Sequence, residues 1–245
     1  MLMGMSWGTA AMFYLSCMLS AVIQSVSGFG FAIFMMSVIP NVLPYTTSTV
    51  VSGLLSLGTN VANTTRYRKY IDWKQIWFPM AGYFVVSFLV VTFAAGKSDE
   101  LLKRILGVVL IGLSIYFLFF SNKIHIRPTP RNGVIAGGLS GVLGGLFSMS
   151  GPPMVVYMLS TGKEKEDYLG TIQMYFFITN LYTNVLRFFN GMVQMQDILL
   201  VLSGLIFSTT GFLIGVRLLK HIDAALLKKI IYAFMAFSGL SMVIR

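Results

Sequence analysis

The sequence predicts an all-α polytopic membrane protein with two inverted repeats, each a broken, re-entrant helix hairpin followed by three transmembrane helices. Of its 245 residues, 56% are hydrophobic and only 11% are charged, and the charged residues fall between long apolar runs. A helix satisfies every backbone polar group inside a bilayer, and about 20 apolar residues span it. Short sequences also recur at a nearly constant offset, which indicates an internal duplication.

The apolar runs predict ten helical segments when they are taken in order along the chain. In the first half the segments lie at 8–27, 28–40, 46–65, 76–96 and 101–121. In the second half they lie at 132–150, 151–161, 168–189, 196–216 and 225–244. The second and seventh segments are too short to cross a bilayer alone. Each therefore forms a broken helix pair with the segment before it, over 8–40 and 132–161.

The two halves of the chain repeat one another. Ser27-Gly28 recurs as Ser150-Gly151, 123 residues later. Three further matches follow in the same order: Thr59-Asn60-Val61 with Thr183-Asn184-Val185, Asp99 with Asp223, and Leu101–Ile105 with Leu226–Ile230. Four ordered matches favour a duplicated five-segment unit. We therefore divide the chain into an N-terminal repeat, 1–124, and a C-terminal repeat, 125–245.

Basic residues in the loops indicate how the segments cross a cell membrane, the inner or plasma membrane. If the breaks are hairpin tips, one side of the membrane carries 13 basic residues and the other carries five. The basic side comprises the loops 66–74, 123–131, 163–165 and 217–229. If each broken segment crosses once instead, the split is nine to nine, which satisfies no positive-inside rule. The charge distribution therefore favours hairpins entering from opposite sides, with both termini outside.

Glycine and proline interrupt the two broken segments. The motifs are Ser27-Gly28-Phe29-Gly30 and Ser150-Gly151-Pro152-Pro153. Irregular backbone at membrane depth is tolerated only where it lines protein or a watery cavity, and matched breaks in two halves point to a transport site. A helix N-terminus follows each break, and its free N–H groups and partial positive charge attract anions. Serine hydroxyls would add donors, from Ser27, Ser148 and Ser150.

The alternative is that the small residues near the breaks only allow close helix packing. We prefer that role for glycines 137, 138, 141, 144 and 145. Proline pairs do not promote close packing, however, so for the breaks themselves we favour a binding site. Its predicted centre is the two motifs, 27–30 and 150–153.

Polar side chains on apolar helices are further candidates for contact with a substrate. They are Gln24, Asn60, Gln173, Asn180 and Asn184. A buried amide costs a few kcal/mol unless it is hydrogen-bonded, so the alternative for Asn60 and Asn184 is an interhelical hydrogen bond. Arg187 lies in the last turn of its predicted helix. We expect this arginine to extend to lipid headgroups, and gathering an anion is the alternative.

Several classes of function lack the residues they need. The predicted spans hold no Asp or Glu away from their ends, where Asp197 is the second residue of 196–216. This argues against a cation transporter and against a membrane-embedded enzyme. The lone Cys17 and two histidines form no ligand cluster, so we expect no metal and no cofactor. The net charge of +10 comes from loops that flank the spans. It indicates contact with the lipid bilayer and not with nucleic acid.

Several stretches of the sequence carry a resemblance to a known family, and together they cover essentially the whole chain. They are 27–32 with Pro40, 144–153, the turn Ile71-Asp72-Trp73, 101–104 and 226–229. In these stretches the chain resembles the sulfite exporter TauE/SafE family of sulfur-compound and anion permeases. That family commonly has Gly-x-Gly-Gly-Gly at the breaks, whereas this chain has Ser-Gly-Phe-Gly and Ser-Gly-Pro-Pro. This departure resembles a distinct branch.

The resemblance implies a secondary carrier for sulfur-containing or organic anions such as sulfite, sulfoacetate or thiosulfate. The residues alone indicate a small anionic substrate, moved by alternating access around the two hairpin tips. An anion channel that uses the same helix ends is the alternative, and a membrane-embedded enzyme is a third, disfavoured one. Coupling to protons or sodium and assembly as a homodimer are left open by the sequence.

Overall fold

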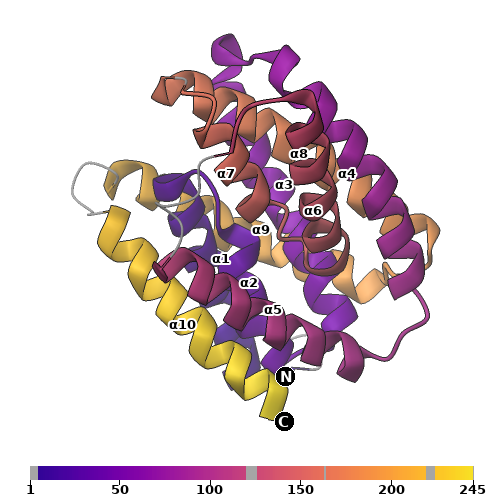
Figure 1. The fold of residues 1–245 in the computed structure, drawn as a ribbon. Helices are drawn as coiled ribbons and strands as arrows, with labels where there is room; N and C mark the ends of the chain where they lie inside the picture. Colours follow the sequence, from indigo (N-terminus) through magenta and orange to yellow (C-terminus); the bar gives the residue numbers. More distant parts are fainter. Residues whose placement is uncertain (1–4, 120–125, 163, 219–223, 245) are drawn as a thin grey trace.

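The fold is a bundle of helices, seen in a computed structural model that describes residues 5–119, 126–162, 164–218 and 224–244 (Figure 1). In the first half the helices are α1 (Trp7–Ser27), α2 (Phe31–Val38), η1 (Ile39–Asn41), α3 (Tyr45–Arg66), η2 (Arg68–Tyr70), α4 (Trp73–Ala94) and α5 (Asp99–Phe119). In the second half they are α6 (Pro130–Phe147), α7 (Gly151–Leu159), α8 (Lys165–Phe189), α9 (Met195–Leu218) and α10 (Ala224–Ile244).

The all-α membrane fold predicted from hydropathy is confirmed. Each of the ten predicted segments is helical, and the helix ends that the structure describes lie within three residues of the predicted ones. Within the part of the chain that the structure describes, four helices are long and apolar enough to cross a membrane, namely α1, α4, α5 and most of α9. The helices α3 and α8 are more polar because they lie inside the bundle, where most of their Ser, Thr and Asn side chains are buried.

Each broken segment folds back on itself as a hairpin. In the first hairpin Ser20 Oγ of α1 lies 3.9 Å from Met35 Sδ of α2, and α1 also contacts η1 beyond the second arm. In the second hairpin a Cβ placed on Gly133, near the start of α6, would lie 3.0 Å from Tyr157 Oη, near the end of α7. The arms therefore run antiparallel, and each break is the tip of a hairpin.

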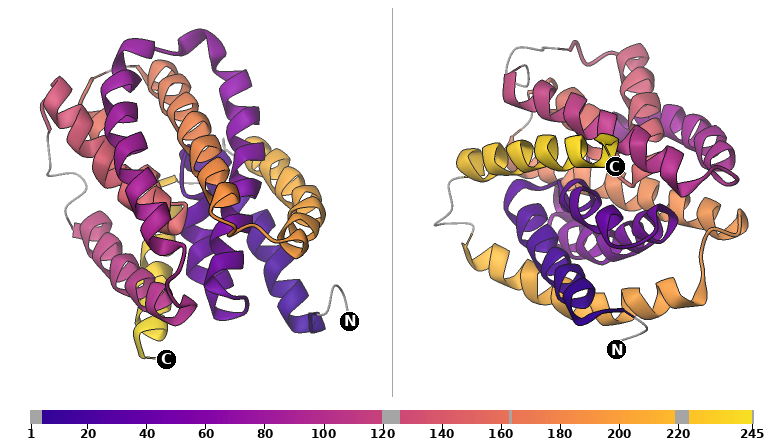
Figure 2. Two further views of the ribbon diagram at one scale, coloured as in Figure 1. Left: turned by 90° about the vertical axis from the view of Figure 1, so that its right-hand side faces the viewer. Right: turned by 90° about the horizontal axis from the view of Figure 1, so that it is seen from below.

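The helices of the two halves pack reciprocally. α1 packs against α9 and α6 against α4, while α3 pairs with α8 and α5 with α10. The helices α5 and α10 lie side by side along one edge of the molecule (Figures 1 and 2). This is the pattern expected of halves related by a two-fold axis. The repeat boundaries, 1–124 and 125–245, and the inverted orientation stay predictions.

Glycines allow the closest of these helix contacts. A Cβ on Gly137 of α6 would collide with the Pro79 carbonyl of α4, and one on Gly141 would lie 2.9 Å from the Tyr83 carbonyl oxygen. Helices approach this closely in membranes when one partner has no side chain. The packing role predicted for these two glycines is confirmed.

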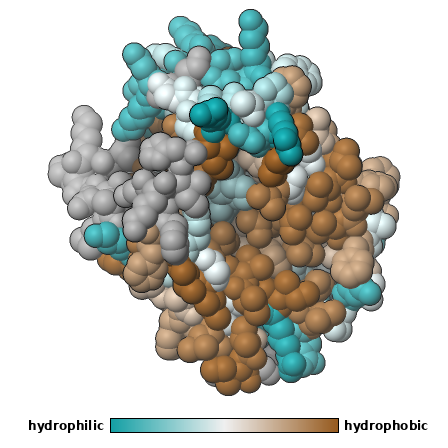
Figure 3. Space-filling model, in the orientation of Figure 1, coloured by the Kyte–Doolittle hydropathy of each residue, from teal (hydrophilic) through white to brown (hydrophobic). Residues whose placement is uncertain are grey.

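The surface has the division expected of a bilayer protein. Hydrophilic residues gather at the end that carries η2 and the start of α8, and apolar residues cover the flank below (Figure 3). Large apolar side chains are exposed on the outer helices, for example Val85, Leu89, Ile206 and Phe237. The start of α1 and the end of α10 lie at the end of the molecule opposite η2 (Figure 1). Contact with lipid explains why large apolar side chains are exposed on the outer helices.

The predicted orientation can be tested by cysteine labelling in a Cys17→Ser background, because Cys17 is the single native cysteine and is buried. Ser6→Cys and Gly96→Cys, at exposed positions on the predicted outer side, are expected to react with an impermeant maleimide in intact cells. Lys69→Cys, exposed beside η2, is expected to react only after permeabilisation. The reverse pattern would contradict the charge-based topology.

Candidate functional site

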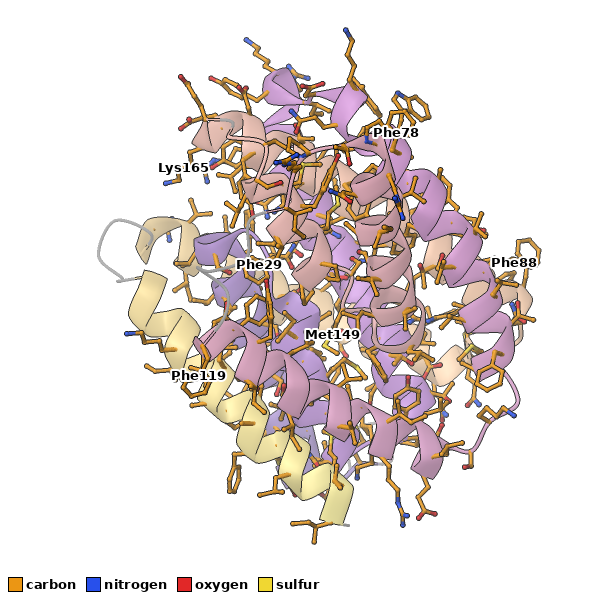
Figure 4. The ribbon with its side chains drawn as sticks, viewed as in Figure 1. Phe29, Phe78, Phe88, Phe119, Met149 and Lys165 are labelled. Carbon is orange, nitrogen blue, oxygen red and sulfur yellow. The ribbon has the colours of Figure 1, made fainter. Side chains whose placement is uncertain are left out.

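The two hairpin tips meet around a small cavity inside the bundle. Its volume is about 40 Å³. On this scale a water molecule takes roughly 10–15 Å³, so the cavity has room for a few waters or one small anion. Figure 4 shows Phe29 and Met149, one from each tip, in the interior of the molecule. The wall is formed by residues of α1, both tips, α3 and α8: Gln24, Phe29–Ile33, Ser56, Asn60, Ser148–Gly151, Phe176 and Asn180.

The first tip depends on two glycines. Gly28 ends α1 with a φ of 79°, and Gly30 precedes α2 with a φ of 108°. Residues with a side chain rarely adopt these left-handed angles, which is why glycine stands at both positions. The Ser27 hydroxyl donates to the carbonyls of Ile23 and Phe29 within the tip. That hydroxyl proton is therefore engaged by the protein in this state.

The first residues of α2 carry a set of free backbone donors and lie in the wall of the cavity. The first intrahelical bond runs from Phe34 N–H to the Gly30 carbonyl at 3.0 Å. The N–H groups of Phe31, Ala32 and Ile33 precede that bond and have no acceptor within the helix. All three residues line the cavity. Together with the partial positive charge of a helix N-terminus, they make this wall attractive to an anion.

The second tip is built differently. α6 ends at Ser148, which has a φ of 60° although it is not a glycine, and α7 begins at Gly151. Pro152 and Pro153 have no N–H, so Gly151 supplies the one donor among the first three residues of α7. Both prolines line a separate apolar cavity of about 340 Å³. The second helix N-terminus thus contributes fewer donors to the polar cavity than the first.

Amide side chains connect the cavity wall across helices. Gln24 Nε2 of α1 donates to Asn60 Oδ1 of α3 at 2.6 Å, and Asn180 Nδ2 of α8 donates to Ser56 Oγ of α3. The interhelical bond considered for Asn60 is therefore present. It engages the carbonyl oxygen of that amide and leaves the Asn60 N–H groups as donors at the cavity wall.

Two of the predicted residues lie behind the wall. Gln173 Nε2 donates to the Gly28 carbonyl and so holds the first tip. Asn184 Nδ2 donates to the Asn180 backbone carbonyl at 2.9 Å and to Asn180 Oδ1 at 2.8 Å. Both side chains act on residues of the site and do not line the cavity themselves.

The predicted site residues thus divide into two groups, and their binding of a substrate stays a prediction. Eight of them line the cavity: Gln24, Phe29, Gly30, Asn60, Ser148, Ser150, Gly151 and Asn180. The other six do not: Ser27, Gly28, Pro152, Pro153, Gln173 and Asn184. The cavity also includes Ser56, which the sequence analysis missed although it lies one helical turn before Asn60.

The expectation that Arg187 extends to lipid headgroups is wrong. Its side chain is fully buried, with 0% exposure. Nη1 donates to Ser148 Oγ at 2.7 Å and to the Thr49 carbonyl at 3.2 Å, and Nη2 donates to the carbonyls of Gly144 and Gly145 at 3.2 and 3.1 Å. The broken end of α6 offers open carbonyls, so the guanidinium finds acceptors inside the bundle. Asn180, Asn184 and Arg187 follow one another at intervals of four and three residues, which places all three on one helix face. This spacing was the signal that the sequence offered for a buried Arg187.

The sequence model described as "Sulfite exporter TauE/SafE" matches residues 13–242 of the chain. The chain belongs to the sulfite exporter TauE/SafE family. This membership confirms the resemblance found in the sequence. Because the match runs from α1 to α10, both hairpins and the cavity between them lie inside the region shared with the TauE/SafE family.

One curated protein is similar in sequence to part of this TauE/SafE family member. The "Probable sulfite/organosulfonate exporter TauE" of Cupriavidus necator is 28% identical over 146 residues. The match covers 54% of this chain and 54% of that protein, so it spans about half the length of the curated relative. No solved structure matches the chain.

Proposed function

We propose that this TauE/SafE family member is a secondary transporter for small sulfur-containing or organic anions such as sulfite, sulfoacetate or thiosulfate. The observation that carries the proposal is the cavity between the hairpin tips. There the residues that carry the first three N–H groups of α2 line the same small space as Asn60. Such donors bind an anion without a cationic side chain in direct contact.

The size of the cavity supports a small oxyanion as the substrate. A volume of about 40 Å³ suits an anion the size of sulfite, and a longer organosulfonate would need a wider state of the site. The curated relative is named for sulfite and organosulfonate export, and we extend that substrate class and direction to this chain as part of the proposal.

The arrangement of the tips favours alternating access over a permanently open pore. The cavity is walled by one hairpin from each half, and Gln24, Asn60 and Asn180 at its edge are all at least nine-tenths buried. Rocking one half against the other would open the same site to either side of the membrane in turn. An anion channel would instead need a continuous water-filled path past these residues.

Counterflow in proteoliposomes tests this function. Vesicles loaded with unlabelled sulfite are expected to take up labelled sulfite transiently and saturably, because a carrier exchanges substrate through one site. Protein-free vesicles are the control, and imposed proton or sodium gradients would identify a coupling ion. Flux that does not saturate and is accompanied by a macroscopic current would reject the carrier in favour of a channel.

A further inference from the structure

Arg187 is a buried charge without a countercharge. Among the residues that the structure describes, the one ion pair joins Arg104 and Glu100, and the four acceptors of Arg187 are neutral carbonyl and hydroxyl oxygens. A buried charge is costly when no opposite charge pairs with it, and charged residues inside membrane proteins usually mark functional sites. A full positive charge at this place is therefore expected to have a function.

The guanidinium is bonded to the end of a helix that points at the cavity. α6 ends at the second tip, and its last carbonyls carry the partial negative charge of a helix C-terminus. Arg187 donates to the carbonyls of Gly144 and Gly145 in that last turn. It also donates to Ser148, which lines the cavity, so a single residue separates the charge from the cavity.

Helix ends alone would leave the cavity nearly neutral. Two helix C-termini, of α1 and α6, and two N-termini, of α2 and α7, meet at the tips. Each end corresponds to about half an elementary charge, negative at the C-terminus and positive at the N-terminus, so the four contributions largely cancel. At the first tip the carbonyl of Gly28 is bonded by the neutral amide of Gln173. At the second tip the carbonyls of α6 are bonded by the guanidinium of Arg187, which carries a full positive charge. The total charge around the cavity is therefore positive.

The neighbouring helix is shaped to admit this side chain. A Cβ on Gly53 of α3 would lie 2.9 Å from Arg187 Nη1 and 2.7 Å from Asn184 Oδ1. Glycine at this position lets α3 pass close to the guanidinium. The position of the Arg187 guanidinium thus depends on α3 of the first half and α8 of the second half, in addition to α6.

We propose that Arg187 determines the charge selectivity of the cavity: it neutralises the C-terminal end of α6 and gives the site a net positive potential that favours divalent over monovalent oxyanions. The proposal rests on the proposed anion site. Arg187 acts through the α6 carbonyls and Ser148, and not by contact with the anion. Its contribution to binding grows with the charge of the ligand, because the Coulomb energy is proportional to that charge.

The test compares a divalent with a monovalent probe, thiosulfate and methanesulfonate, by calorimetric titration of the purified protein. In Arg187→Gln and Arg187→Met, the ratio of thiosulfate to methanesulfonate affinity is expected to fall on the order of tenfold. This is the Coulomb effect of one charge at about 10 Å and an effective dielectric constant of about 20. Arg187→Lys, which keeps the charge, is expected to keep most of the ratio. Arg104→Gln removes the same charge from an exposed position and is expected to leave the ratio unchanged.

The outcomes separate this inference from the proposed function. If the wild-type protein binds neither probe, the anion site itself fails. If it binds both but the ratio is unchanged in a folded neutral variant, or falls equally in Arg187→Lys, the inference is overturned. If neither neutral variant folds while Arg187→Lys folds normally, Arg187 is a structural residue and the inference is likewise overturned.

Discussion

Replacing Gly151 with leucine is expected to abolish transport while leaving the protein folded in the membrane. Gly151 lines the cavity at the start of α7, and a Cβ there would meet Phe29 Cδ2 at 3.5 Å and Phe176 Cζ at 3.7 Å, which are ordinary contact distances. The three further carbons of leucine would enter a space of about 40 Å³. We expect sulfite counterflow to fall roughly a hundredfold, the effect of losing about 2.8 kcal/mol of anion binding.

Gly151→Ala is the matched control for this substitution. Its single methyl group fits the contact distances of the wild-type protein, so it is expected to keep most of the transport rate. Size-exclusion chromatography and thermal unfolding of the purified variants check that both are folded. Counterflow at the wild-type rate in a folded Gly151→Leu protein would show that the anion does not pass through this cavity.

Replacing Gly137 with leucine is expected to damage the fold rather than the site. A Cβ at Gly137 would collide with the main-chain carbonyl of Pro79, so α4 and α6 would have to separate along their contact. Overpacking lowers the free energy of unfolding by about 1–3 kcal/mol where side chains can adjust. Because the obstacle here is the main chain of Pro79, we expect a loss at the upper end of that range. The expected fall in Tm is about 6–12 °C, from about 2–4 °C per kcal/mol for a chain of this size.

Gly112→Leu is the control for the packing prediction. Gly112 lies on an exposed face of α5, and a Cβ there would meet nothing within 4 Å. Its leucine variant is expected to unfold at the wild-type temperature when both proteins are heated in the same detergent. If Gly137→Leu also unfolds at the wild-type temperature, the close contact between α4 and α6 does not contribute to stability.

The helices could be predicted from the sequence because each is a local property of the chain. Length and hydropathy were enough to place the ten segments, since a bilayer demands a minimum apolar length. Glycine and proline marked the hairpin tips, because few other residues adopt the backbone angles found at Gly28 and Gly30. The partners of each helix were not predictable in this way. Gln173, for example, bonds to a carbonyl 145 residues earlier in the chain.

The candidate site could likewise be predicted only in its local features, and its tertiary contacts could not. The two motifs were predicted as equivalent halves of one site, yet Pro152 and Pro153 face a different, apolar cavity. Arg187 was interpreted from its own helix, where a basic residue in the last turn usually extends to the headgroups. Its acceptors belong to the broken end of α6 and to α3, which only tertiary packing brings alongside.

Each hairpin tip is held by a helix of the other half, and this has a consequence for biosynthesis. Gln173 of α8 bonds the Gly28 carbonyl of the first tip, and Ser148 of the second tip bonds the Thr49 carbonyl of α3. Because Thr49 precedes Ser148 in the chain, the partner of the second tip has already been synthesised when that tip emerges from the ribosome. The first tip has to wait for 145 more residues to be translated. The proposed anion site is therefore completed late, when α8 packs against the helices of the first half.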